Sequence, residues 1–167
     1  MGLKYEKPEG LNRVVLTDPV HFLAFGFGTG LMPVAPGTWA SLFTAIVFWF
    51  LPDIPMTVYL GAVGVLFLLG IWVCGVSSRR LKVHDFQGIT FDEVVGMLAT
   101  LSVVGHDPIW IIVAFFFFRV ADVWKPWPIR DVDHSLAGGL GIMLDDLLAA
   151  VYAALATFLM QYLFTVI

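Results

Sequence analysis

The chain has 167 residues, of which 59% are hydrophobic and only 13% are charged, and its mean hydropathy is +0.89. Soluble domains contain about 45–50% apolar residues, so this composition excludes an ordinary soluble domain and is typical of a membrane protein. The net charge of −4 excludes a generally basic nucleic-acid-binding protein, and a single cysteine, Cys74, supports neither a disulfide framework nor a thiolate zinc site.

The N-terminal segment, MGLKYEKPEGLNRVV, has no apolar stretch followed by a small-residue cleavage site. We therefore predict no cleavable signal peptide, and we expect the first spanning helix to direct the chain to the membrane. Residues 21–32 are too short and too rich in glycine to span a bilayer, and they are predicted to form an interfacial or re-entrant segment.

Five apolar runs follow, at residues 39–51, 56–76, 94–104, 109–121 and 147–167. Two of them are clearly long enough to cross a hydrocarbon core of about 30 Å, whereas the helices of the other three must include polar ends near the lipid headgroups. The predicted fold is an all-α, polytopic membrane bundle of about five short transmembrane helices after the N-terminal segment. It forms one membrane-embedded domain over residues 1–167.

The nine lysines and arginines fall in alternate connections between these runs. Basic residues favour the cytoplasmic side of a membrane, so the N-terminus and two long loops are predicted to be cytoplasmic and the C-terminus to lie on the opposite side. The three basic groups are Lys4, Lys7 and Arg13; Arg79, Arg80 and Lys82; and Arg119, Lys125 and Arg130.

Carboxylates gather at the same predicted face. Clustered carboxylates near lipid are costly unless they are hydrated, paired or bound to a cation. Without nearby Cys or regularly spaced His, they suit Mg²⁺ better than zinc. They are Asp92 and Glu93 where the third helix is expected to begin, Asp122 where the fourth ends, Asp131 and Asp133 in the next loop, and Asp145 and Asp146 where the fifth begins.

Each group of acids also has a simpler interpretation. Thr90 and Glu93 fit a capping box, and acids in a first helical turn favour the helix dipole. The same dipole argument applies to Asp145 and Asp146. Arg119 and Asp122 fit an i, i+3 ion pair at a helix end. These alternatives remain open from the sequence alone.

The stretch KPWPIRD places two cations beside the acids. Pro126 and Pro128 prevent helix continuation and favour an extended path, so Lys125 and Arg130 are expected on a stiff segment. Fixed cations suit a phosphate, because arginine offers a planar fork to its oxygens and lysine a point charge. The alternative is anchoring to anionic headgroups, which does not explain the neighbouring acids.

Two glycine-rich stretches and several polar residues carry further alternatives. GFGTG at residues 26–30 and AGGLG at residues 137–141 are compatible with phosphate-binding loops or with close helix packing. Thr38 is expected to cap the first spanning helix, although its hydroxyl can also face a headgroup. His21, His106 and His134 are expected at the interface or the surface.

Three long motifs resemble a known family. They are GFGTGLMPVAPGTWAS at residues 26–41, HDFQGITFDEVVGM at 84–97 and FRVADVWKPWPIRDVDHSLAGGLGIMLDDLLA at 118–149. These motifs resemble phosphatidylglycerophosphatase A, a family of bacterial Mg²⁺-dependent lipid phosphatases, and the resemblance covers most of the chain. It implies hydrolysis of phosphatidylglycerophosphate to phosphatidylglycerol and inorganic phosphate at the cytoplasmic face of the plasma (inner) membrane, by a multi-pass protein.

The resemblance also implies roles for individual residues. His84 and Asp85 match an HD pair, which is either a polar turn or a proton-handling and metal-binding element. Asp131 departs from the family pattern and is a weaker candidate ligand. The expected Mg²⁺ ligands are Asp92, Glu93, Asp122, Asp133, Asp145 and Asp146. The expected phosphate-binding residues are Arg119, Lys125, Arg130, His84 and Thr38, and the expected catalytic residues are Asp92, Glu93, Asp122, Lys125, Arg130 and Asp146.

The expected partners are phosphatidylglycerophosphate and membrane lipids, with no nucleic acid and no obligate protein partner. Two other functions remain as alternatives, a phosphatase for another lipid phosphate and a small cation transporter. Transport would place carboxylates near the middle of spanning helices, whereas here they cluster at one end.

Overall fold

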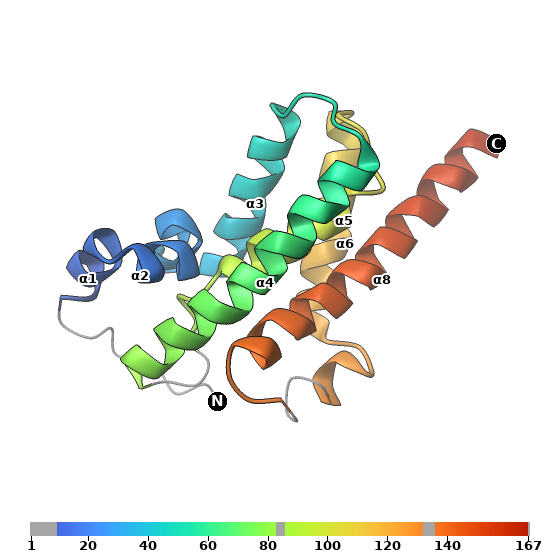
Figure 1. Cartoon of the computed structure of the whole chain (residues 1–167). Coiled ribbons are helices and arrows are strands. Elements are labelled where there is room, and N and C mark those ends of the chain that lie inside the picture. Colours follow the sequence, from blue (N-terminus) through green and yellow to red (C-terminus); the bar gives the residue numbers. More distant parts are fainter. Residues whose placement is uncertain (1–9, 83–85, 132–135, 167) are drawn as a thin grey trace.

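The structure, a computed structural model, describes residues 10–82, 86–131 and 136–166. Within these ranges the regular elements are all helical, so the predicted all-helical class is confirmed for the described part of the chain (Figure 1). The elements are α1 (Leu11–Thr17), α2 (Pro19–Ala24), the 3-10 helix η1 (Gly26–Leu31), α3 (Pro36–Trp49), α4 (Met56–Leu81), α5 (Phe91–Leu101), α6 (Pro108–Trp124) and α8 (Gly139–Val166).

Proline and aspartate set where two of the longer helices begin. Pro36 and Pro108 occupy the first turns of α3 and α6, where the missing N–H is not needed for an intrahelical hydrogen bond. Asp107 caps α6 by accepting a hydrogen bond from the backbone N–H of Ile109 at 2.8 Å. These local signals fix the starts of α3 and α6 before any packing is considered.

The short helix α5 lies at the centre of the bundle and packs against α3, α4, α6 and α8 (Figure 1). Gly96, in the middle of α5, allows two of these neighbours to approach closely. A Cβ atom at Gly96 would lie 2.8 Å from the ring of Phe118 in α6 and 3.1 Å from the backbone oxygen of Asp146 in α8. The middle of α5, about one turn after Asp92, is therefore packed closely against both α6 and α8.

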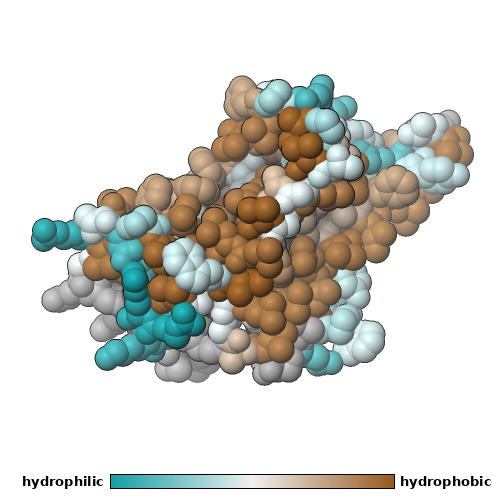
Figure 2. Space-filling view, viewed as in Figure 1, coloured by the Kyte–Doolittle hydropathy of each residue, from teal (hydrophilic) through white to brown (hydrophobic). Residues whose placement is uncertain are grey.

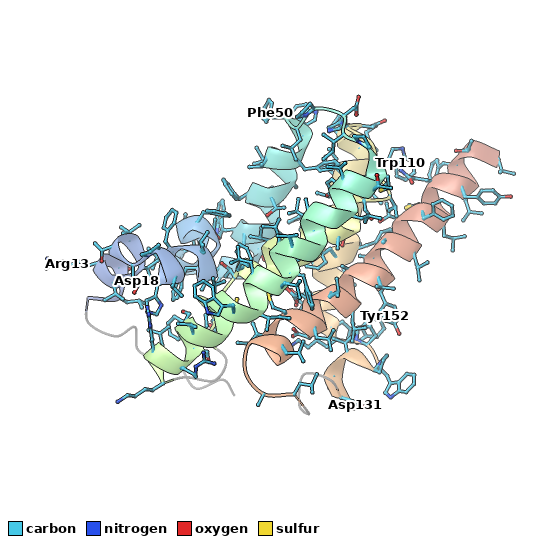
Figure 3. All side chains as sticks on the ribbon, viewed as in Figure 1. Arg13, Asp18, Phe50, Trp110, Asp131 and Tyr152 are labelled. Atoms are coloured by element: carbon cyan, nitrogen blue, oxygen red, sulfur yellow. The ribbon has the colours of Figure 1, made fainter. Side chains whose placement is uncertain are left out.

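The connections between α3 and α4 and between α5 and α6 lie together at one end of the bundle. Asp53 Oδ1 and His106 Nδ1, one from each connection, are 3.1 Å apart. Figure 3 places Phe50 and Trp110 at this end and Asp131 at the other. The basic residues at the ends of α4 and α6 lie a full helix length away from Asp53 and His106. The helices therefore alternate in direction, as the distribution of Lys and Arg predicts.

Two helices are long and apolar enough to cross a membrane by length and composition. These are α4, with 26 residues, and α8, with 28, and only 33% and 22% of their most apolar stretches are buried inside the protein. Much of the outer surface along the helices is hydrophobic (Figure 2). The helices α3, α5 and α6 have 14, 11 and 17 residues, which corresponds to about 17–26 Å at 1.5 Å per residue.

Three local predictions are wrong. Thr38 does not cap α3, because the helix begins at Pro36 and Ala35 is its N-cap, with φ of 48°. Residues 126–128 form a turn and residues 129–131 are helical, so this segment is not extended, and Ile129 N donates to Pro126 O at 2.8 Å. Asp145 and Asp146 lie beyond the first turn of α8, which contains no acidic residue.

Candidate active site

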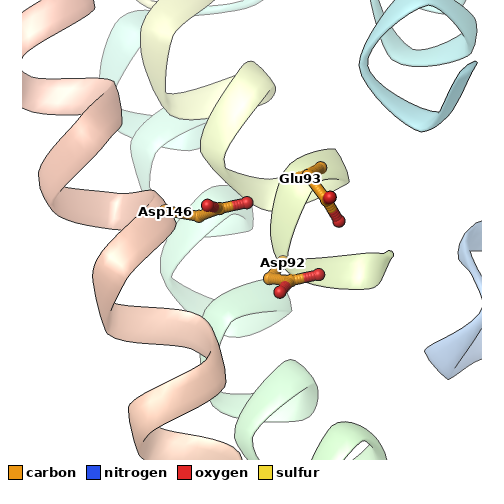
Figure 4. Close-up of side chains that lie close together, drawn as sticks. All are labelled: Asp92, Glu93 and Asp146. Atoms are coloured by element: carbon orange, nitrogen blue, oxygen red, sulfur yellow. The ribbon is translucent and has the colours of Figure 1, made fainter. Parts of the chain in front are cut away.

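Three carboxylates from two helices converge inside the bundle. Asp92 and Glu93 lie in the first turn of α5, and Asp146 reaches toward them from α8 (Figure 4). One oxygen of each lies within 4.8 Å of the others. Carboxylates this close repel one another unless a cation or shared protons compensate their charge.

The surroundings of these acids fit a bound cation. Asp92 Oδ1, Glu93 Oε2 and Asp146 Oδ2 are buried and accept no hydrogen bond from the residues that the structure describes. Buried polar atoms normally have a partner, and an all-carboxylate set of oxygens is the chemistry that hard divalent cations bind. We therefore regard Asp92, Glu93 and Asp146, together the acidic triad, as a candidate metal site.

Helix capping does not explain the acids. The backbone N–H of Thr90, which a capping box would pair with Glu93, donates instead to the carbonyl of Ala24 at 2.9 Å. The Thr90 side chain makes no capping hydrogen bond to α5. The capping-box interpretation is therefore wrong, and the acids of α8 lie too far into the helix to act on its first turn.

Two ion pairs flank the acidic triad. Arg119 Nη1 and Asp122 Oδ2 are 2.6 Å apart within the last two turns of α6, and the side chains are only 16% and 13% exposed. Lys125, the residue that ends α6 with φ of 46°, places its Nζ 2.7 Å from Asp145 Oδ2. Arg119 Nη1 also donates to Ser41 Oγ at 3.3 Å. The predicted i, i+3 pair is present, but it is half-buried rather than at the surface.

These groups share one cavity of about 390 Å³. It is open to the outside, so the acidic triad and both cations can be reached from it. Its lining comes from the start of α3, the segment before α5, the first turn of α5, the end of α6 and α8. The lining residues are Ala35, Pro36, Gly37, Gln87, Ile89, Asp92, Glu93, Arg119, Asp122, Lys125, Asp145 and Asp146.

Comparison with known proteins identifies the family of the chain. The family model for phosphatidylglycerophosphatase A matches residues 22–161. The chain belongs to the phosphatidylglycerophosphatase A family. No solved structure matches the chain.

Curated relatives extend over nearly the whole chain. A phosphatidylglycerophosphatase A of Escherichia coli (strain K12) is 40% identical over 154 residues, covering 91% of this chain and 89% of the relative. The protein of the same name from Haemophilus influenzae is 41% identical over 154 residues, covering 91% and 94%. A Bacteroides thetaiotaomicron protein, provisionally named a phosphatidylinositol-3-phosphatase, is 35% identical over 139 residues, covering 77% and 84%.

The cavity brings together most of the acids and cations expected from the family motifs, but not all of them. Arg130 and Asp131 are exposed and do not line it, and Thr38 is half-buried and also outside its lining. The expected roles of His84, Asp85 and Asp133 concern positions outside the described residues. Which residues perform the chemistry therefore stays a prediction, now centred on the acidic triad, Asp122, Asp145, Arg119 and Lys125.

The histidines differ from expectation at one position. His21 is buried rather than interfacial, with 3% of its surface exposed, and its Nδ1 lies 2.8 Å from Ser77 Oγ. Burial lowers the pKa of His21 below its ordinary value. His106 is partly exposed beside Asp53, as expected, and His134 lies outside the described residues.

Two residues of the motif PVAPGTWAS were missed. A Cβ atom at Gly37 would overlap the carboxylate of Glu93, so only glycine leaves room for this acid. Ser41 lies one turn later, on the same face of α3, and binds Arg119. A glycine and a serine four residues apart are a weak signal in a sequence. Glycine has no side-chain functional group, so its residue type does not indicate a role at a site.

The two glycine-rich stretches serve packing. Gly30 touches the backbone of Gly88, and Thr29 Oγ1 lies 3.3 Å from Thr90 Oγ1, so GFGTG is fastened to the segment that leads into α5. Gly139 lets the start of α8 approach the backbone of Ile71 in α4. Neither stretch lines the cavity, which favours the packing alternative over phosphate-binding loops.

Proposed function

We propose that the protein is a phosphatidylglycerophosphate phosphatase that hydrolyses the terminal phosphomonoester to phosphatidylglycerol and inorganic phosphate. The main support is the acidic triad, which has buried oxygens without partners among the described residues. The triad lines a cavity together with Arg119 and Lys125. This combination suits a phosphate group held beside a divalent cation. The names of the Escherichia coli and Haemophilus influenzae relatives support the same substrate.

Asp92, Glu93 and Asp146 would hold Mg²⁺, because one oxygen of each lies close to the others and each carboxylate has one oxygen without a hydrogen-bond partner among the described residues. When bound, Mg²⁺ supplies charge neutralisation at the phosphoryl group and lowers the pKa of a water molecule. Asp122 and Asp145 are engaged by Arg119 and Lys125 at 2.6 and 2.7 Å. We assign these two acids to positioning the cations.

Arg119 is the best-placed residue to bind the substrate phosphate. Asp122 and Ser41 hold its Nη1 atom, while its buried Nε has no hydrogen-bond partner among the described residues. That N–H can donate to a phosphate oxygen, and Lys125 adds a second positive charge in the same cavity. Water then attacks phosphorus, the bond to the glycerol oxygen breaks, and that oxygen takes up a proton to become the phosphatidylglycerol hydroxyl.

The proposed arrangement is one membrane-embedded domain over residues 1–167, multi-pass in the bacterial inner membrane, with the cavity facing the cytoplasm. Two observations support it: the apolar helices α4 and α8, and the basic residues at the ends of α4 and α6. Cysteine labelling tests it. Cysteines introduced at Asp53 and His106 should react from the periplasmic side and one at Arg80 from the cytoplasm, and cytoplasmic labelling at His106 would contradict the arrangement.

Phosphate release by the purified protein tests the activity. We expect turnover of phosphatidylglycerophosphate that stops in EDTA and returns with Mg²⁺. Phosphatidic acid and phosphatidylinositol 3-phosphate belong in the same panel, because the Bacteroides thetaiotaomicron relative carries a name for the latter substrate. Preferred turnover of another lipid phosphate would reassign the substrate, and full activity in chelator would contradict the metal site.

A further inference from the structure

A second, uncharged concavity runs along the seam between α3 and α6. This groove has a volume of about 200 Å³ and is lined by four residues of each helix, all of them aliphatic, proline or aromatic. Ala45 and Ile111 are only 5% and 6% exposed, whereas Ile46 and Ile112 are 48% and 66% exposed. The groove is therefore an open trench with a buried floor, and the small side chain of Ala45 contributes to its depth.

The two walls of the groove, α3 and α6, also contribute to the lining of the charged cavity. Gly37 of α3 and Arg119 of α6 line the cavity, and the hydrogen bond from Arg119 to Ser41 joins the two helices beside it. Residues four apart lie on the same face of a helix, so one face of each helix leads from the cavity to the groove. These residues are Ser41, Ala45 and Trp49 on α3, and Arg119, Phe115 and Ile111 on α6.

The distance between the two features is short. Phe115 and Ala45, both lining the groove, lie four residues from Arg119 and Ser41, which corresponds to about 6 Å along each helix. The groove then extends about 6 Å farther to Trp49 on α3 and about 10 Å farther to Pro108 on α6. A charged site is thus followed directly by an uncharged trench that points away from the charged end of the bundle.

We propose that this groove binds one acyl chain of the lipid whose phosphate occupies the cavity. The inference rests on the proposed function and adds the place of the lipid tail. A molecule with a charged head and an apolar chain matches a charged cavity continued by an uncharged groove. A bulk bilayer lipid or a second copy of the chain would match the groove alone, and would not use its continuity with Arg119.

This placement has a consequence for kinetics. A lipid chain enters the groove from a micelle or bilayer rather than from water, so its gain comes from packing against the groove walls and is smaller than the about fourfold per methylene that transfer from water gives. Long-chain substrates should still bind more tightly than short-chain ones with the same head. A substitution that fills the groove should remove that advantage and leave the chemistry at the phosphate unchanged. The chain length of the substrate is therefore the variable that separates the groove from the cavity.

The first experiment fills the groove with Ala45→Phe and uses Ala62→Phe, at an exposed position of α4, as the matched control. Activity is measured in neutral detergent on dioleoyl and dibutanoyl phosphatidylglycerophosphate. We expect Ala45→Phe to lower kcat/KM about tenfold for the dioleoyl substrate, through KM, and less than about twofold for the dibutanoyl substrate. The control should change neither. Equal losses on both substrates, or no loss, would overturn the proposal.

The second experiment needs no variant and no turnover. A phosphatidylglycerophosphate with a diazirine in one acyl chain is photolysed with the native protein in EDTA and neutral detergent, and labelled peptides are mapped. We expect labelling at Ile46 or Ile112 that excess phosphatidylglycerophosphate displaces and phosphatidylcholine does not.

Three other outcomes would overturn the proposal: equal displacement by both lipids, which indicates a bulk lipid site; crosslinks between two copies of the chain at these residues; and no labelling at the groove. Failure of the proposed function is a separate result. If the proposed function is wrong, the native protein releases no phosphate. The labelling experiment still shows in that case whether the groove binds the lipid tail and whether binding depends on the head group.

Discussion

The two ends of the bundle hold charge in different ways. At the cavity end, Arg119 and Asp122 are only 16% and 13% exposed, and the acidic triad has buried oxygens without partners among the described residues. At the opposite end, the Asp53 side chain is 98% exposed beside His106. Buried charge costs free energy that exposed charge does not, so stability does not explain the charged groups at the cavity end, and the proposed function assigns them to binding and chemistry.

The largest expected effect comes from the acidic triad. Asp92→Asn and Asp146→Asn should each lower kcat for phosphate release at least about 100-fold, because each removes a charge that stabilises the transition state through the metal. EDTA should give a loss of the same order, reversed by Mg²⁺. Asp53→Asn, the same change at the opposite end, is the control and should retain at least half of the activity. Comparable losses from Asp53→Asn and Asp92→Asn would abolish the distinction between the two ends.

The next effect separates two arginines near the cavity end. Arg119→Ala should lower kcat/KM about tenfold to a hundredfold, since it removes charged hydrogen bonds to the phosphate. Arg130→Ala should cost less than about threefold, because Arg130 is exposed and outside the cavity. Assays in neutral detergent remove the contribution of anionic membranes. A loss from Arg130→Ala as large as that from Arg119→Ala would show that the exposed arginine binds the substrate.

A smaller effect is expected at Gly37. In Gly37→Ala the new methyl group would overlap the Glu93 carboxylate, so Glu93 must move, and the Mg²⁺ concentration for half-maximal activity should rise about tenfold. The matched control is Gly61→Ala in α4, where a Cβ atom meets nothing within 4 Å. If both variants required the same Mg²⁺ concentration as the native protein, Gly37 would not set the position of Glu93.

The smallest effect is expected at the opposite end. His106→Ala removes the contact with Asp53, which is almost fully exposed, and the stacking of the His106 ring on Phe48. Exposed pairs contribute little to stability, so the lost stacking accounts for most of the effect. We expect a fall in Tm of less than about 4 °C and unchanged kcat. Thermal unfolding and phosphate release on the same preparation measure both. A loss of activity without a loss of stability would place function at this end as well.

Much of the architecture could be predicted from hydrophobic runs and the distribution of basic residues. The apolar stretches became the helices α3, α4, α5, α6 and α8, and the connections without Lys or Arg meet at Asp53 and His106. The acids of the third and fourth helices lie at the predicted helix ends. These features depend on local sequence, because hydrophobicity and caps decide where helices start and stop.

The details that depend on tertiary contacts could not be predicted. Thr90 fits a capping box by sequence, but the carbonyl of Ala24 takes its N–H. Gly37 contributes only the space that its missing side chain leaves for Glu93. Arg130 was expected on an extended segment, yet it lies in the helical residues 129–131 that follow a turn at 126–128, exposed and outside the cavity. The partners of Thr90 and Gly37 are far away in the sequence, so no local pattern indicates them.

The division of the acidic triad between α5 and α8 has a consequence for biosynthesis. A chain is made from its N-terminus, so Asp92 and Glu93 emerge from the ribosome more than 50 residues before Asp146. Until α8 docks beside Gly96, the first turn of α5 carries two acids and lacks the third. The nascent protein should therefore remain inactive toward membrane lipids while it is being inserted, and gain activity only when its last described helix joins the bundle.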